Sequence, residues 1–254
     1  MRYTLLLALF SILLMTMLVT AQNRSLPSTD QAAVWYERGI KHYDQRNYKQ
    51  AIAAFDRSLQ YKPDNPKAYN NLGSLHALLD FYDESVFNFT EAIRLKPDFA
   101  EAHRNLGSVY YNAGRMNKAV TELRRAIKLK PDDAESYYIL GTALSALRKH
   151  EESITTLEKA VKLNPLDARY HYDLGLSLSV AGKPKTAIGY LKNALSQRPD
   201  HNEAHYVIGV AYLKIKKRKL AIEHYSQLKK LNAELADDLY RQLYKDKVVA
   251  AVKK

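Results

Sequence analysis

Residues Tyr69–Pro97 read YNNLGSLHALLDFYDESVFNFTEAIRLKP, and altered copies of this stretch recur along most of the chain. The copies keep a spacing of 34 residues, which is clearest at glycine and proline. The glycines are Gly39, Gly73, Gly107, Gly141, Gly175 and Gly209, and the prolines are Pro63, Pro97, Pro131, Pro165 and Pro199. A period of this length is typical of stacked helix pairs, so it predicts an all-α solenoid.

Each unit is expected to hold two amphipathic helices. In the quoted unit, helical spacing lines one face with Tyr69, Leu72, Gly73 and His76, and a second face with Ser85, Phe89 and Ala92. Glycine within a helix costs about 1 kcal/mol relative to alanine, so its repetition indicates close approach of a neighbouring helix. Proline ends the second helix, and the aspartates that follow it are expected to cap the next one. Those aspartates are Asp64, Asp98, Asp132 and Asp200.

These residues resemble the tetratricopeptide repeat family, whose pattern is tryptophan, leucine–glycine, tyrosine, alanine, phenylalanine, alanine and proline. The third unit matches it with Leu106, Gly107, Tyr110, Ala119, Leu123, Ala126 and Pro131. The end units depart, since Arg38 takes the leucine slot and Ala233 the proline slot, as terminal repeats often do. The resemblance covers residues 31–233 and implies a right-handed superhelical solenoid of six helix-turn-helix repeats.

The N-terminus has a different composition. Arg2 precedes an uncharged apolar run at residues 4–20, and Val19-Thr20-Ala21 offers a cleavage site with small residues. This pattern predicts a secretory signal peptide over residues 1–21 and a polar linker over residues 22–30. An uncleaved anchor is the alternative, because 17 residues approach the shortest transmembrane span. We therefore expect a periplasmic or secreted protein, or one anchored in the inner membrane.

The C-terminal part carries much of the basic charge. Residues 234–254 are expected to form a capping helix and basic tail, with an amphipathic stripe of Leu235, Leu239, Tyr240 and Leu243. The net charge of the chain is +12, and half of this excess falls on residues 202–254. Lys214, Lys216, Lys217, Arg218 and Lys219 cluster at one turn. They either contact an anionic membrane surface or form a solvated surface, and no motif indicates nucleic acid.

Motifs for catalysis are absent from the sequence. It contains no glycine-rich phosphate loop, no Ser, His and Asp arrangement and no cysteine, so we expect no enzyme and no cofactor. His103, His171 and His205 occupy the slot of Trp35 and Tyr69 in other units, which favours packing over a metal site. Asn23 and Asn88 match the N-glycosylation pattern, but Asn88 falls within an expected helix.

The resemblance implies a concave groove, lined by the first helices, that receives a peptide or a partner's helix. By repeat register the groove residues are Tyr36, Tyr43, Asn70, Asn71, Arg104, Asn105, Tyr111, Tyr138, Arg169, Tyr172, Asp173 and Tyr206. Tyrosine is enriched at binding hot spots, although some of these rings can instead be packing residues.

The functional prediction is a non-catalytic scaffold or adaptor in the bacterial envelope with a protein or peptide partner. One alternative is a membrane-tethered assembly factor for a pilus or secretion machine. The other is an accessory subunit of an envelope enzyme.

Overall fold

The structure is a computed structural model that describes residues 28–252, which form helices joined by short turns. The predicted signal peptide and most of the predicted linker lie outside these residues. The helices are α2 (Ser28–Asp44), α3 (Tyr48–Tyr61), α4 (Pro66–Leu78), α5 (Tyr82–Leu95), α6 (Ala100–Asn112), α7 (Met116–Leu129), α8 (Ala134–Ala146), α9 (His150–Leu163), α10 (Ala168–Val180), α11 (Pro184–Gln197), α12 (Asn202–Lys214), α13 (Arg218–Leu231) and α14 (Ala233–Val252).

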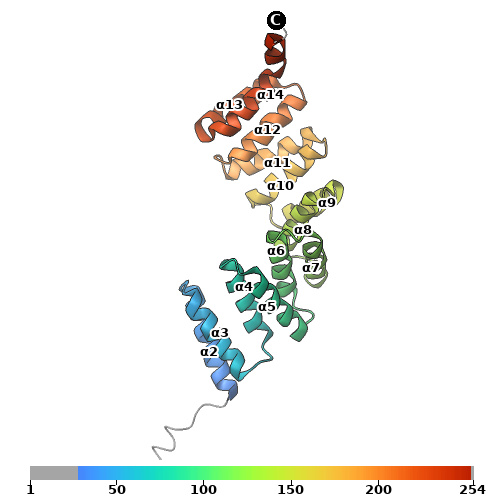
Figure 1. Cartoon of the computed structure of the whole chain (residues 1–254). Helices are drawn as coiled ribbons and strands as arrows, with labels where there is room; N and C mark the ends of the chain where they lie inside the picture. Colours follow the sequence, from blue (N-terminus) through green and yellow to red (C-terminus); the bar gives the residue numbers. More distant parts are fainter. Residues whose placement is uncertain (1–27, 253–254) are drawn as a thin grey trace, which may run out of the picture.

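The helices stack in chain order into an elongated, curved array (Figure 1). Each even-numbered helix from α2 to α12 packs against the helix that follows it, and each pair packs against the next pair. The even-numbered helices from α4 to α12 also contact one another from repeat to repeat, whereas no comparable contacts join α3, α5, α7, α9, α11 and α13 within the described part. The first helices of the pairs therefore form an inner layer and the second helices an outer layer. The predicted all-α solenoid is confirmed.

The repeated glycines lie where the two helices of a pair approach closely. A Cβ atom built on Gly39 would lie 2.6 Å from the Phe55 ring, and one built on Gly107 would lie 2.6 Å from Leu123 Cγ. Contacts this short leave no room for a side chain, so the packing role predicted for these glycines is confirmed.

The last repeat is closed by α14, which packs against both α12 and α13. Leu239 of α14 lies against Gly209. In the other repeats, a residue of the outer helix lies against the equivalent glycine. Leu239 and Leu243 are fully buried, whereas Tyr240 is 45% exposed. The expected apolar stripe thus excludes Tyr240, whose ring instead packs against the neighbouring tyrosine rings of Tyr225 and Tyr244. None of the described helices combines the length and apolar character that crossing a membrane requires.

The prediction for the helix N-caps is wrong by one residue. The aspartates that follow proline (Asp64, Asp98, Asp132 and Asp200) lie in the turn, and the N-cap is the next residue. Asn65 Oδ1, for example, accepts hydrogen bonds from the backbone N–H groups of Lys67 and Ala68 at 3.1 and 3.3 Å. The physical reason is that the chain turns through two residues before it reaches the extended conformation of an N-cap.

The turn within each repeat requires a residue with positive φ. This slot also recurs every 34 residues, and it holds Arg46, Asp80, Gly114, Arg148, Gly182 and Lys216, with φ between 58° and 76°. Only two of the six are glycine, the residue that adopts this conformation without strain. The glycine spacing alone therefore did not reveal the slot.

Candidate functional site

A hollow of about 290 Å³ opens on the inner layer between α2, α4 and α6. It is lined by Tyr43, Ser74, Ala77, Leu78, Phe89, Asn105, Ser108, Val109 and Asn112. Leu78 is 54% exposed and Tyr43 is 37% exposed, so apolar surface stands beside hydroxyl and amide groups. Such a mixture suits an extended peptide, because amides pair with its backbone while apolar surface accepts a side chain.

Amide side chains connect the first three repeats behind this hollow. Asn71 Nδ2 donates to the Tyr36 hydroxyl at 3.1 Å, and Asn105 Nδ2 donates to Asn70 Oδ1, also at 3.1 Å. Asn70 Nδ2 in turn donates to Glu101 at 3.2 Å. Asn70 is buried, with 3% of its surface exposed, so it supports the inner layer and offers a ligand little contact area. The network holds neighbouring inner helices in register.

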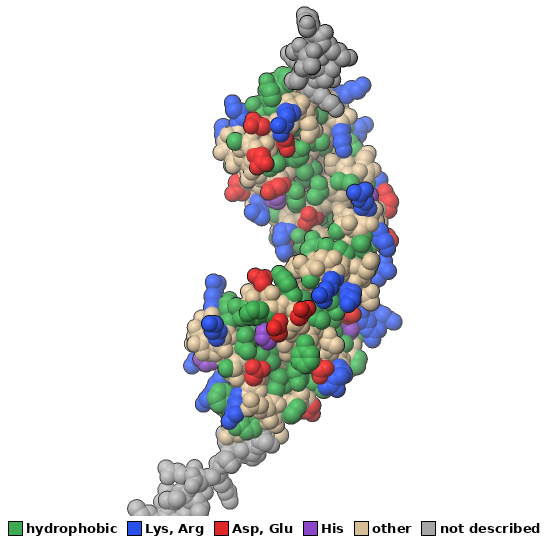
Figure 2. All heavy atoms as spheres, viewed as in Figure 1, with side chains coloured by type: hydrophobic (Ala, Val, Ile, Leu, Met, Phe, Trp, Pro, Cys, Tyr) green, Lys and Arg blue, Asp and Glu red, His purple; other side chains and the backbone are tan. Residues whose placement is uncertain are grey.

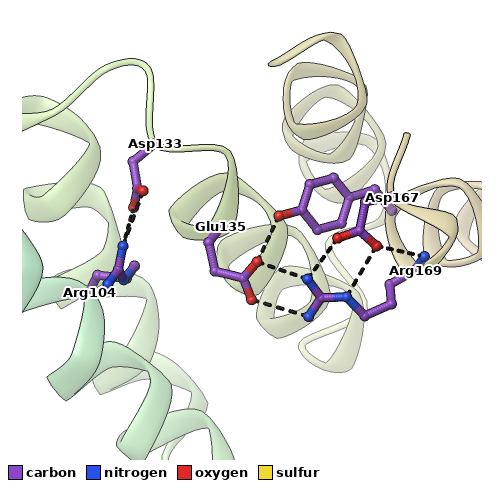
Figure 3. Close-up of polar contacts among 6 residues, drawn as sticks. Arg104, Asp133, Glu135, Asp167 and Arg169 are labelled. Atoms are coloured by element: carbon purple, nitrogen blue, oxygen red, sulfur yellow. Dashed lines mark hydrogen bonds and ion pairs between the residues drawn. The ribbon is translucent and has the colours of Figure 1, made fainter. Parts of the chain in front are cut away.

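Arg169 is the centre of a second cluster, where α8 meets α10 (Figure 3). Its guanidinium is paired with Glu135 at 3.1 Å and with Asp167 at 2.7 Å. It also lies over the rings of Tyr138 and Tyr170, at 5.0 and 5.4 Å from their centroids. Burial raises the pKa of the Asp167 carboxyl, but hydrogen bonds from Arg169 outweigh this and hold that pKa below its usual value. Arg169 is therefore locked in place at neutral pH.

Aromatic rings continue this cluster along α10. Tyr138 stacks on Tyr170 with ring centroids 4.7 Å apart, and Tyr172 lies against the His201 ring at 4.5 Å. Burial raises the pKa of Tyr138, and a hydrogen bond with Asp173 raises it further. Burial likewise raises the pKa of Tyr172 to about 12. Both hydroxyls therefore stay protonated at neutral pH and can act as hydrogen-bond donors.

Arg104 extends the first cluster to Asp133 at the start of α8. Its guanidinium pairs with Asp133 Oδ1 at 3.2 Å (Figure 3). It also approaches Asn105 Oδ1 at 3.5 Å. Together the clusters form a polar and aromatic strip from α2 to α10, which we call the inner strip. Figure 2 shows the molecule hollowed on one side near its middle, with charged and hydrophobic side chains around the hollow.

The structure does not bring all predicted groove residues together. The first network contains a Tyr36–Asn71 pair and a separate chain of Asn70, Asn105 and Arg104. The second contains Tyr138, Arg169, Tyr172 and Asp173. Tyr111 packs against the buried cluster of α7 and α8. Tyr206 accepts a hydrogen bond from Gln242 of α14 at 2.8 Å, away from both networks.

Glu135, Asp167 and Tyr170 were missed by the sequence reasoning. A signal for one of them exists, because Glu135 and Arg169 stand 34 residues apart and so occupy the same slot of successive repeats. Equivalent slots of stacked repeats lie side by side, so opposite charges there predict an ion pair.

The histidines at the repeated position, His103, His171 and His205, join each inner helix to the turn that precedes it. In each case Nε2 donates to the carbonyl oxygen of the proline six residues earlier, at 3.1 Å for His103 and 2.9 Å for both His171 and His205. The described residues contain no group of three acidic or histidine side chains placed to hold a metal ion. Asn88 is buried and donates to the Glu84 carbonyl oxygen at 2.8 Å, which leaves its glycosylation pattern inaccessible. Asn23 lies outside the described residues.

Sequence models of one family match most of the chain. A model of the TPR repeat matches residues 39–80, 82–114 and 107–147, and tetratricopeptide repeat models match residues 134–165 and 172–238. The chain belongs to the tetratricopeptide repeat family. The family repeat thus accounts for both layers of helices, and the inner strip lies on the first helices of its repeats.

Several solved structures have the same fold. YrrB, a TPR protein with an unusual peptide-binding site, is 23% identical with a TM-score of 0.68, over 75% of this chain and all of YrrB. MamA is 26% identical with a TM-score of 0.62, over 68% of this chain and 94% of MamA. PilF of Pseudomonas aeruginosa is 16% identical with a TM-score of 0.74, over 85% of this chain and 99% of PilF. No curated protein sequence is similar enough to count as a match.

Proposed function

We propose that this tetratricopeptide repeat protein is a non-catalytic adaptor that binds a segment of a partner protein along its inner layer. The observation that carries the proposal is the hollow between α2, α4 and α6, which shares Asn105 with the inner strip. YrrB, which shares the fold, is a peptide-binding protein, and this supports the same use of the fold here. The preformed solenoid lowers the ordering cost of binding, because its side chains already hold one another in place.

The chemistry of the hollow indicates the kind of segment that it binds. Asn105, Ser108 and Asn112 present amide and hydroxyl groups to the backbone of an extended chain. Leu78 and Tyr43 accept an apolar side chain. The arginines of the strip are already paired with carboxylates, so a neutral, partly apolar segment is the preferred ligand over a strongly charged one.

We place this adaptor in the bacterial envelope, and the support for this comes from the sequence alone. The apolar run at residues 4–20 and the small residues after it have the pattern of an export signal. An uncleaved run would instead make the protein the membrane-tethered assembly factor considered above.

The test uses a photo-crosslinking amino acid at Asn112, in the hollow, and at Thr90, exposed on the outer helix α5. We expect a partner that crosslinks from Asn112 but not from Thr90. A synthetic peptide of the crosslinked segment is then titrated by calorimetry against wild type, Ser108→Arg and Thr90→Arg.

Ser108→Arg fills the hollow and is expected to weaken peptide binding by more than about tenfold, while Thr90→Arg leaves it unchanged. Equal crosslinking from both positions, or an unchanged dissociation constant in Ser108→Arg, would show that the partner does not bind in the hollow.

A further inference from the structure

The positive charge of the chain lies outside the inner layer. The inner helices α2, α4, α6, α8, α10 and α12 carry seven acidic and six basic side chains, counting Asp, Glu, Lys and Arg. The outer helices α3, α5, α7, α9, α11 and α13 carry nine acidic and fifteen basic side chains. Figure 2 shows Lys and Arg side chains along the flank opposite the hollow. The basic excess is therefore separate from the partner-binding layer.

This excess is most one-sided on α11 and α13, which together carry six basic side chains and a single acidic one, Glu223. Five exposed lysines on these helices are Lys185, Lys192, Lys219, Lys229 and Lys230, which we call the outer lysine face. The ion pairs found among the described residues include none of the five. None of the five is therefore directly paired with a carboxylate of the described residues.

Some side chains of the two helices come close together. Lys192 of α11 is near enough to His224 of α13 to act on it electrostatically, and α11 and α13 both line one hollow through Leu195 and Gln227. None of the five lysines lines that hollow.

Apolar side chains are exposed beside these lysines. Ile222 and Leu231 of α13 are 36% and 40% exposed, and Tyr240 of the adjoining α14 is 45% exposed. Lysines combined with exposed leucine, isoleucine and tyrosine are typical of surfaces that lie on a bilayer, where the apolar groups enter the headgroup region.

We propose that the outer lysine face docks this protein on an anionic phospholipid bilayer. Lysine is a mobile point charge that suits diffuse attraction to a charged surface, whereas a defined carboxylate or phosphate site favours the fork of arginine. An acidic protein would also attract the lysines, but it would not account for the exposed Ile222 and Leu231. Docking by this face leaves the hollow on the inner layer open to a partner, so the proposal is independent of the adaptor function.

Vesicle sedimentation with the full chain tests the proposal. The vesicles contain either phosphatidylcholine alone or phosphatidylcholine mixed with phosphatidylglycerol. One variant changes all five lysines of the outer lysine face to glutamine. The matched control changes five exposed lysines elsewhere, Lys49, Lys62, Lys128, Lys159 and Lys162, to glutamine, so both variants lose the same charge.

Wild type is expected to prefer the anionic vesicles, with binding that weakens as salt is raised. Each lysine near an anionic surface contributes several-fold to partitioning, so the face variant should bind them more than about tenfold more weakly than the control variant. Equal losses in both variants would reduce the effect to net charge and overturn the proposal. If wild type binds both kinds of vesicle equally, the N-terminal apolar run and not the lysines makes the attachment. This result would also overturn the proposal.

Insertion of α13 into the bilayer is measured in a separate experiment. Because the chain contains no cysteine, one introduced cysteine provides a single site for a reactive label. Ser226→Cys places an environment-sensitive dye on the exposed side of α13, and Thr90→Cys places it on α5 as a control. We expect anionic vesicles to shift the emission of the dye to shorter wavelength at position 226 alone. No shift there, with protein bound to the vesicles, would show that another surface makes the contact.

Discussion

At the scale of single residues, glycine has three different roles in this chain. Gly107 allows α6 to approach α7, Gly114 supplies positive φ in a turn, and Gly189 lies exposed in α11 with open space around it. The local sequence does not distinguish the first role from the third, because both glycines lie within helices. Their substitutions should therefore change stability in opposite directions.

Gly107→Ala should destabilise the protein by about 1–3 kcal/mol, because the new methyl group would lie 2.6 Å from Leu123 Cγ. Gly189→Ala should stabilise it by about 1 kcal/mol, since alanine is the better helix former and meets no neighbour. Denaturant unfolding of both variants measures the two changes. Stabilisation by Gly107→Ala would mean that the helices separate at no cost and that the packing role is wrong.

The turn slot gives a second pair of substitutions. Arg148 holds φ at 58°, a conformation that costs a residue with a side chain about 1–2 kcal/mol. Arg148→Gly should therefore raise stability, by about 0.5–1 kcal/mol after the greater entropy of glycine in the unfolded chain is deducted. Gly114→Ala in the equivalent turn should lower stability by a similar amount, as measured by thermal unfolding. A lower stability of Arg148→Gly would indicate that contacts of the arginine side chain outweigh the strain.

At the scale of elements, the C-terminal helix α14 supplies the large side chain that the outer helix of the sixth repeat does not place over its glycine. In the other repeats a large outer-helix side chain covers the glycine, as Leu191 covers Gly175. Gly209 is covered by Leu239 of α14 instead, so α14 completes the sixth repeat as well as shielding its end.

Leu239→Ala should lower the free energy of unfolding by about 2–5 kcal/mol, because it opens a cavity at the contact of α12 with α14. Tyr240→Ala is the control on the same helix, and its exposed position predicts a change below about 1 kcal/mol. Circular dichroism during denaturant unfolding measures both. Equal effects of the two substitutions would contradict the capping role of Leu239.

The contact between α12 and α13 should weaken in acid. His205 Nε2 donates to the Pro199 carbonyl oxygen, so its Nδ1 accepts a hydrogen bond from His224 Nδ1 at 2.9 Å. Burial is the main cause that lowers the pKa of His224, from 6.5 to about 4, and the nearby charge of Lys192 adds to it.

The unfolded chain therefore binds a proton at His224 more readily than the folded chain does. The stability contributed here is complete above about pH 6.5 and is lost as the pH falls towards about 4. We expect the melting temperature of wild type to fall more steeply over this interval than that of His224→Phe. Parallel pH profiles of the two proteins would contradict the assignment of a neutral histidine pair.

At the scale of the whole molecule, the buried apolar residues form separate clusters along the solenoid. The largest extends from α9 to α14 and contains seventeen buried residues, whereas the cluster of α3 and α4 contains four and that of α5 and α6 contains three. Because each repeat contacts only its neighbours, stability is distributed along the chain and need not be lost in one step.

Hydrogen exchange should therefore be slowest in α10–α12 and fastest in α2–α5 among the described helices. Leu191→Ala, in the large cluster, should accelerate exchange in α10–α12 by much more than in α2–α5. Mass-resolved exchange at the level of single helices measures this. Uniform acceleration along the chain would show that the solenoid unfolds as one cooperative unit.

The sequence by itself determined the all-α solenoid, its 34-residue period and the side chains that pack between the two helices of each repeat. The reason is that the apolar face of every helix must be buried against its neighbours. Only the tertiary structure decided which groove residues meet. Tyr138 stacks on Tyr170, and Tyr172 lies against His201, in each case across a repeat boundary. Leu239 of the C-terminal helix covers Gly209. Such contacts depend on how far each repeat is rotated against the next. That rotation follows from the packing of whole side chains and not from their spacing along the chain.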